Sequence, residues 1–190
     1  MRCNSLCHIN SVFTVSLLSL VALSAALAPT AALADTPTPG DIPDNQAFVQ
    51  VAGKGFALKV PEGWARTTRN GTTSFVDKYN GIAIMIAKRA SAPTVSGTRH
   101  AELARLKATI KGFANARVAR VSRPAGSGVL ITYQALSAPN SVTGKRITDD
   151  VERYELWRGG KLAIVTLQAP HGSDNVDAWK LVTSSLRWST

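Results

Sequence analysis

Residues 74–87 read SFVDKYNGIAIMIA, and this stretch decides the class of fold. Two short runs rich in Val, Ile and aromatic residues stand on either side of Asn80-Gly81. Asn-Gly favours a type I′ turn, because both central residues of that turn need a positive φ. The pattern therefore predicts an antiparallel hairpin made of residues 74–79 and 82–87.

Further strands are expected on both sides of this hairpin. Residues 56–60 alternate in polarity and run into Pro61-Glu62-Gly63, which has Pro and Gly where a type I turn prefers them. Gly159-Gly160 predicts the turn of a second hairpin. The other expected strands cover residues 117–122, 128–136, 146–157 and 162–168.

Two segments have the spacing of amphipathic helices. One covers residues 98–112, and the other starts near Asp174 as its N-cap and runs to Leu186. The expected strands 82–87 and 162–167 are apolar on both faces and need cover on both. We therefore expect an α+β fold, an α/β/α sandwich with a mostly antiparallel, twisted sheet covered by helices on both faces.

The first 34 residues have the composition of a signal peptide. Arg2 is their only formal charge, an apolar run covers residues 12–23, and Ala32-Leu33-Ala34 fits an A-x-A cleavage site. The alternative is an uncleaved anchor, because residues 12–28 approach the roughly 20 apolar residues that span a bilayer. Cleavage near Ala34 predicts an exported protein that is periplasmic, associated with the cell wall or secreted, with no transmembrane segment left.

The rest of the chain is expected to form a tether and one domain. Residues 35–46 hold three prolines and little apolar content, which predicts a Pro-rich flexible tether. Residues 47–190 then form a single α/β/α domain. Both cysteines, Cys3 and Cys7, precede the apolar run, so the chain has no lipobox and the cleaved product no thiol.

The charge balance is strongly basic. The 22 Lys and Arg residues against 12 acids give a net charge of +10, which becomes +9 without Arg2. Outside the cytoplasm, lipid head groups, wall polymers and acidic glycans are the available polyanions, and we expect no nucleic acid partner. Five neighbouring cations are candidates for an anion-binding site, with scattered solubilising charge as the alternative: Lys107, Lys111, Arg117, Arg120 and Arg123.

The sequence contains no established catalytic motif. His100 and His171 stand far apart with different neighbours, and HExxH, GxGxxG and GxxxxGK[ST] are all missing. Gly126-Ser127-Gly128 lacks the spacing of a nucleophile elbow. We therefore expect no enzyme activity, no catalytic residue and no cofactor.

One group of carboxylates is a candidate for a hard cation such as calcium. Asp149, Asp150 and Glu152 stand close together on an expected strand, and oxygen ligands suit Ca²⁺. On an extended strand, however, Asp149 points to the face opposite Asp150 and Glu152. The alternative is a solvated strand edge paired with Arg146 and Arg153.

Several strings resemble the PsbP and LpqN-type superfamily of exported proteins. They are FALKVPEGW at residues 56–64, the strands that end at 154–157 and 162–167 around a Gly-Gly turn, and SSLRW at 184–188. The resemblance implies an α/β/α sandwich around an antiparallel sheet. It also implies a role in binding or stabilising other proteins, since the photosystem subunits, envelope lipoproteins and Ran-binding factors of this superfamily share no catalytic residues.

The sequence thus predicts an exported, non-enzymatic envelope or secreted protein that binds or stabilises an extracytoplasmic macromolecular partner. The sheet edge, a helix face or the loop at residues 137–144 are the expected contacts. Binding of anionic envelope polymers or lipids through the basic surface is the alternative. A hydrolase or calcium-dependent enzyme that uses the acidic group is a third reading.

Overall fold

The fold is described by a computed structural model, which covers residues 39–140 and 142–189. The expected signal peptide and residues 35–38 lie outside the described residues. No helix in the described ranges is long and apolar enough to cross a membrane.

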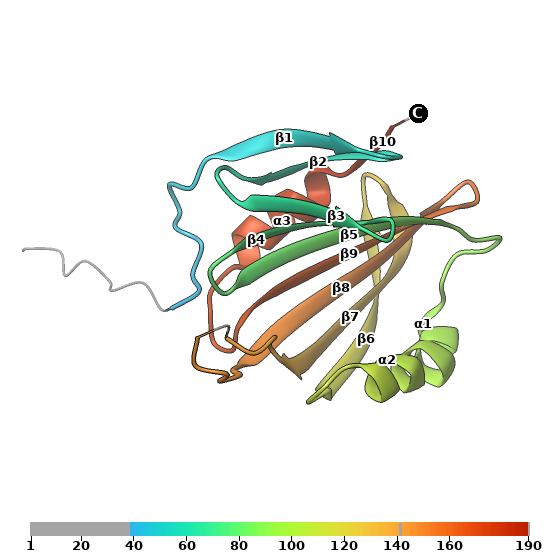
Figure 1. Cartoon of the computed structure of the whole chain (residues 1–190). Coiled ribbons are helices and arrows are strands. Elements are labelled where there is room, and N and C mark those ends of the chain that lie inside the picture. Colours follow the sequence, from blue (N-terminus) through green and yellow to red (C-terminus); the bar gives the residue numbers. More distant parts are fainter. Residues whose placement is uncertain (1–38, 141, 190) are drawn as a thin grey trace, which may run out of the picture. The chain divides into compact units, whose positions relative to one another are not determined.

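The described chain contains two antiparallel sheets and two helical segments (Figure 1). The small sheet has the order β1-β2-β10, and the large sheet has the order β3-β4-β5-β9-β8-β7-β6. The helical segments are the continuous α1–η1–α2, in which η1 is a π-helix, and α3 near the C-terminus.

The strands of the small sheet are β1 (Phe48–Gly53), β2 (Phe56–Pro61) and β10 (Arg187–Trp188). Those of the large sheet are β3 (Ala65–Arg69), β4 (Thr72–Asp77), β5 (Asn80–Lys88), β6 (Ala114–Arg123), β7 (Gly126–Leu136), β8 (Thr148–Arg158) and β9 (Lys161–Pro170). The helices are α1 (Val95–Gly97), η1 (Thr98–Glu102), α2 (Leu103–Thr109) and α3 (Val176–Ser185).

Both predicted hairpins form, but the first one turns at a different place. Asp77 pairs with Asn80 across β4 and β5, so the turn residues are Lys78 and Tyr79 rather than Asn80-Gly81. Lys78 takes the positive φ, at 48°. The Asn80 side chain is instead buried and accepts a hydrogen bond from Asn175 Nδ2 at 3.3 Å. The second hairpin turns at Gly159-Gly160 as predicted, with Arg158 paired to Lys161.

The large sheet carries a hydrophobic core on each face. Because side chains alternate along a strand, Tyr154 and Leu156 of β8 join the first core and Val151 joins the second. Trp179 and Val182 of α3 contribute to the first core, together with the small sheet. Leu106 of α2 contributes to the second core, with β6, β7 and β8. In Figure 1, α3 lies beside β2, and α1 lies beside β6.

The α+β class and the mostly antiparallel sheet are therefore confirmed. The predicted sandwich layout is less complete, because the small sheet shares one side of the large sheet with α3. That a full layer of helices covers each face of the large sheet stays a prediction.

Residues 39–46 are bound to the domain, which differs from the expected free tether. The Ile42 amide donates to Asn175 Oδ1 at 2.7 Å, and Asn175 Nδ2 donates to the Gly40 carbonyl at 2.9 Å. The Asp174 amide donates to Asp41 Oδ1 at 2.8 Å. Ile42 is only 8% exposed. Its apolar side chain and these hydrogen bonds hold the segment against the start of α3.

Candidate functional site

A polar groove of about 350 Å³ lies on the large sheet next to α3. Its polar walls come from three neighbouring strands, and the register explains why they meet. Thr132 of β7 pairs with Arg117 of β6 and with Glu152 of β8, so the three side chains share one face. Gln134 and Asp150 form the next pair along the same two strands. The lining residues are Asn115, Arg117, Thr132, Tyr133, Gln134, Asp150, Val151, Glu152 and Trp179.

The Asp150 carboxylate is held by three groups. His171 Nδ1 lies 2.8 Å from its Oδ2, the Gly172 amide donates to the same oxygen at 3.2 Å, and Gln134 Nε2 donates to Oδ1 at 3.2 Å. Partial burial works against the charged form, but these hydrogen bonds outweigh it, His171 most of all. They hold the pKa of Asp150 below its usual value. The side chain is therefore a fixed anion at one end of the groove.

Glu152 is fixed by a second set of contacts. The Tyr154 hydroxyl donates to Glu152 Oε2 at 2.7 Å. The Arg123 guanidinium lies over the Tyr154 ring, 5.2 Å from its centre, and donates to the buried Thr183 hydroxyl at 3.2 Å. Burial, and then the hydrogen bond to Glu152, raise the pKa of Tyr154 to about 12. The phenol consequently stays protonated and keeps donating to the carboxylate.

Trp179, which lines the groove, carries a hydrogen-bond donor that the described residues do not use. The residue is only 8% exposed and lines the groove from α3. Within residues 39–140 and 142–189 its indole N–H has no hydrogen-bond partner, and it is not fully buried. A buried Trp usually finds a partner for this group. The Arg117 guanidinium and Thr132 hydroxyl are likewise unpaired in the described ranges. The groove thus offers donors that the fold itself does not use.

The structure separates the three acidic candidates. Asp150 and Glu152 line the groove, whereas Asp149 lies on the opposite face of β8 and is 3% exposed. Burial, and then the charge of Asp150, raise the pKa of Asp149 to about 6. No group of three His, Cys, Asp or Glu among the described residues could hold a metal ion. The three carboxylates therefore do not come together at one point.

The five basic candidates do not form one cluster either. Arg117 and Arg123 lie on the face of β6 that looks toward the groove and Tyr154. Arg120 lies on the other face, with Val118 of the second core, because the strand alternates. Lys107 on α2 and Lys111 after it are exposed. Arg123 is engaged in the contacts described above. It acts on the groove through Tyr154, whose hydroxyl binds Glu152.

The contact between His171 and Asp150 is one that sequence reasoning missed. A plain surface or cap role is the expectation for a lone histidine. The β8–β9 register pairs Asp150 with Ala169, which brings the residues just after β9 next to the carboxylate. The predicted Gly159-Gly160 hairpin already fixes this pairing. Counting outward from the turn is the signal that would have found the contact.

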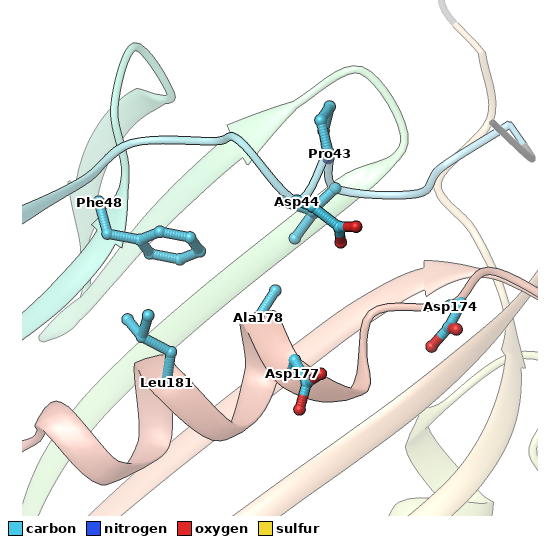
Figure 2. Close-up of a pocket in the computed structure, with 8 residues that line it drawn as sticks. Pro43, Asp44, Phe48, Asp174, Asp177, Ala178 and Leu181 are labelled. Carbon is cyan, nitrogen blue, oxygen red and sulfur yellow. The ribbon is translucent and has the colours of Figure 1, made fainter. Parts of the chain in front are cut away.

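A second hollow of about 190 Å³ lies between residues 42–48 and α3 (Figure 2). Phe48 faces Leu181 and Ala178 at its apolar end. The other end carries carboxylates from both sides, Asp44 from the N-terminal segment and Asp177 from α3. The pocket is therefore apolar at one end and acidic at the other.

Comparison with known proteins shows similarity in structure only. The chain matches no known family profile and no curated protein sequence. PsbP from the cyanobacterium Synechocystis has a TM-score of 0.48 at 14% identity, with 85% of this chain and 100% of that chain covered. LpqN, involved in cell envelope biogenesis of Mycobacterium tuberculosis, has a TM-score of 0.45 at 13% identity, with 77% and 93% covered.

A third similar structure belongs to a larger protein. It comes from Bacteroides thetaiotaomicron and has a TM-score of 0.47 at 13% identity, with 74% of this chain covered. The chain spans about half of that protein's length, 48%. PsbP and LpqN, the two names expected from the sequence, are thus among the proteins whose fold is similar.

Proposed function

We propose that the protein is an exported, non-enzymatic binding protein that holds a macromolecular partner, a protein of the envelope or the exterior, in the groove beside Trp179. Export rests on residues 1–34, which have the charge pattern, apolar run and Ala-x-Ala site of a signal peptide. Binding rests on the groove.

The observation that carries the proposal is the indole N–H of Trp179, which no described residue accepts, on a nearly buried side chain in a groove whose two carboxylates are fixed. Asp150 and Glu152 are already oriented by His171 and Tyr154. A partner that binds there meets side chains that lose little freedom, and preorganisation of this kind favours affinity. The expectation that the protein is not an enzyme rests on the sequence, which contains no established catalytic motif.

Photo-cross-linking from the groove tests the proposal. A benzoylphenylalanine at position 117 faces the groove, and one at position 120 lies on the same strand but on the opposite face. Both positions hold an exposed arginine, so the pair is matched. We expect a discrete cross-linked product in whole cells from position 117 and none from position 120. Equal products from both positions, or none from position 117, would count against the groove.

A conservative substitution then tests the donor itself. Trp179→3-benzothienylalanine keeps the bicyclic ring and replaces only the N–H by sulfur, so the first core should stay packed. Loss of one hydrogen bond of about 1 kcal/mol should weaken partner binding roughly fivefold. The melting temperature, measured in parallel, should change little. Unchanged affinity for the cross-linked partner would show that the indole N–H plays no part.

A second candidate function is binding of anionic envelope polymers or lipids. It is favoured by the net charge of +10 and by the exposure of Lys107, Lys111 and Arg120. Because the five basic candidates lie on both faces of the large sheet, such binding would depend on total charge more than on one site.

A further inference from the structure

The pocket between residues 42–48 and α3 combines apolar and acidic side chains. At one end, Phe48 and Leu181 face each other across a space that neither fills (Figure 2). Leu181 is 39% exposed. Apolar side chains that stay open to solvent beside a hollow are typical of surfaces that bind partners.

The other end of the pocket is negatively charged in a positively charged protein. Asp44, Asp174 and Asp177 line it, and no Lys or Arg does. With Asp41, which bonds the Asp174 amide, these make four of the 12 acids in a chain of net charge +10. Stabilisation of the α3 N-terminus accounts for Asp177 in the first turn. It does not account for Asp44, which comes from a separate segment.

The two walls of the pocket are fixed to each other. The buried side chain of Asn175 bonds both the Ile42 amide and the Gly40 carbonyl. Asn175 is 3% exposed, so these bonds are shielded from water. The pocket is consequently preformed and does not need a ligand to bring its walls together.

We propose that this pocket docks a segment of a partner protein in which an apolar side chain stands next to lysine or arginine. The apolar residue would sit between Phe48 and Leu181, and the cation would lie at the carboxylate end. Charge complementarity favours this occupant over a second copy of the chain, since two copies would repel through their net charge. The proposal does not depend on the groove beside Trp179.

Titration with a short peptide tests the pocket directly. The probe is an amidated pentapeptide with one phenylalanine between two pairs of lysines, and the comparison peptide has glutamates in place of the lysines. We expect the lysine peptide to shift the NMR signals of Phe48, Ala178 and Leu181 in a saturable way. The glutamate peptide should leave them unchanged. Absence of shifts at these residues, or equal binding of both peptides, would overturn the proposal.

Substitutions distinguish binding of the peptide at the pocket from nonspecific electrostatic attraction to the protein. Asp44→Asn together with Asp177→Asn should raise the dissociation constant of the lysine peptide at least tenfold. Asp77→Asn with Glu62→Gln removes the same charge at exposed positions that do not line the pocket and should change the dissociation constant less than twofold. Equal weakening by both double variants would show nonspecific attraction and refute the site. The NMR spectrum of each free variant reports whether its fold is intact.

Discussion

Asp149 is a buried acid without a compensating partner. Its Oδ1 atom is fully buried and accepts no hydrogen bond within residues 39–140 and 142–189. Burial raises its pKa from 3.8 to about 6, so the folded protein holds this proton more tightly than the unfolded chain does. The stability that the proton provides is therefore complete below pH 4 and is lost as the pH rises through 6.

Asp149→Asn should remove this pH dependence, because the amide resembles the protonated acid and cannot ionise. We expect the free energy of unfolding at pH 7 to rise by about 1–3 kcal/mol over the wild type. At pH 4 the two proteins should be nearly equal. Urea unfolding at both pH values measures the difference. A variant that is destabilised to the same extent at both would contradict the argument.

For single residues, the sequence predicts which face of a strand a side chain occupies better than it predicts which residues that side chain contacts. The opposite orientations of Asp149 and Asp150 follow from the period of a strand and are found in the structure. The position of the first turn does not follow, because Asn80 is the better turn residue locally yet is needed inside the fold. Its side chain bonds Asn175, which is 95 residues further along the chain. Local turn preference is overridden there by a distant buried contact.

At the scale of elements, a network of charges fastens the η1–α2 helix to the sheet. Arg153 of β8 donates to Glu102 at 3.1 Å and to Glu155 at 3.1 Å. Glu155 is 2% exposed and also pairs with Arg89 at 3.5 Å. A pair buried in this way is costly to break, because the remaining charge stays without its partner.

Arg153→Met should therefore destabilise the domain by about 3 kcal/mol. The matched control is Arg105→Ala, which removes an exposed partner of the same Glu102 and should cost about 0.5 kcal/mol. Thermal and urea unfolding of the two variants measure the difference. Similar small losses in both would show that the network contributes little to stability.

The side chain of Asn175 joins two elements that are far apart in sequence. Asn175→Ala leaves the Ile42 amide and the Gly40 carbonyl without their partner. We expect a loss of about 1–3 kcal/mol and faster hydrogen exchange at Ile42. Ser173→Ala removes only an exposed hydroxyl that bonds the Pro39 carbonyl, and should change stability by less than about 0.5 kcal/mol. Unchanged exchange at Ile42 in the Asn175 variant would rule out this clamp.

Elements with an apolar face were predictable, and elements without one were not. β7, β8 and β9 were expected from their runs of Val, Ile and Leu, and their bounds differ from the prediction by a few residues. All five residues of β3 are exposed, so it has no hydrophobic pattern to detect. β1 alternates only weakly, and it forms because its partner β2 offers a full set of backbone hydrogen bonds. Such strands depend on their neighbours.

At the scale of the whole molecule, the groove could not be predicted from the sequence. It needs Arg117, Thr132 and Glu152 to meet, which depends on the registers of two strand pairs. The β6–β7 ladder also contains an irregularity between Ala114 and Arg117, which shifts the pairing of Ala114 relative to the rest of the ladder. Trp179 is added from a helix whose direction over the sheet no local pattern determines. The sequence shows which residue types are present, but it does not show that these side chains come together in one groove.

The net charge gives the last prediction, which concerns the molecule as a whole. Because the five basic candidates lie on both faces of the large sheet, binding to anionic vesicles should follow total charge. Changing Lys107, Lys111 and Arg120 to Glu should weaken binding at low salt as much as changing Lys54, Lys59 and Lys161 to Glu. Vesicle co-sedimentation at 50 mM and 150 mM salt measures both, and binding should fall as the Debye length shortens to about 8 Å. Selective loss with the first triple would instead locate an anion site on the side of α2.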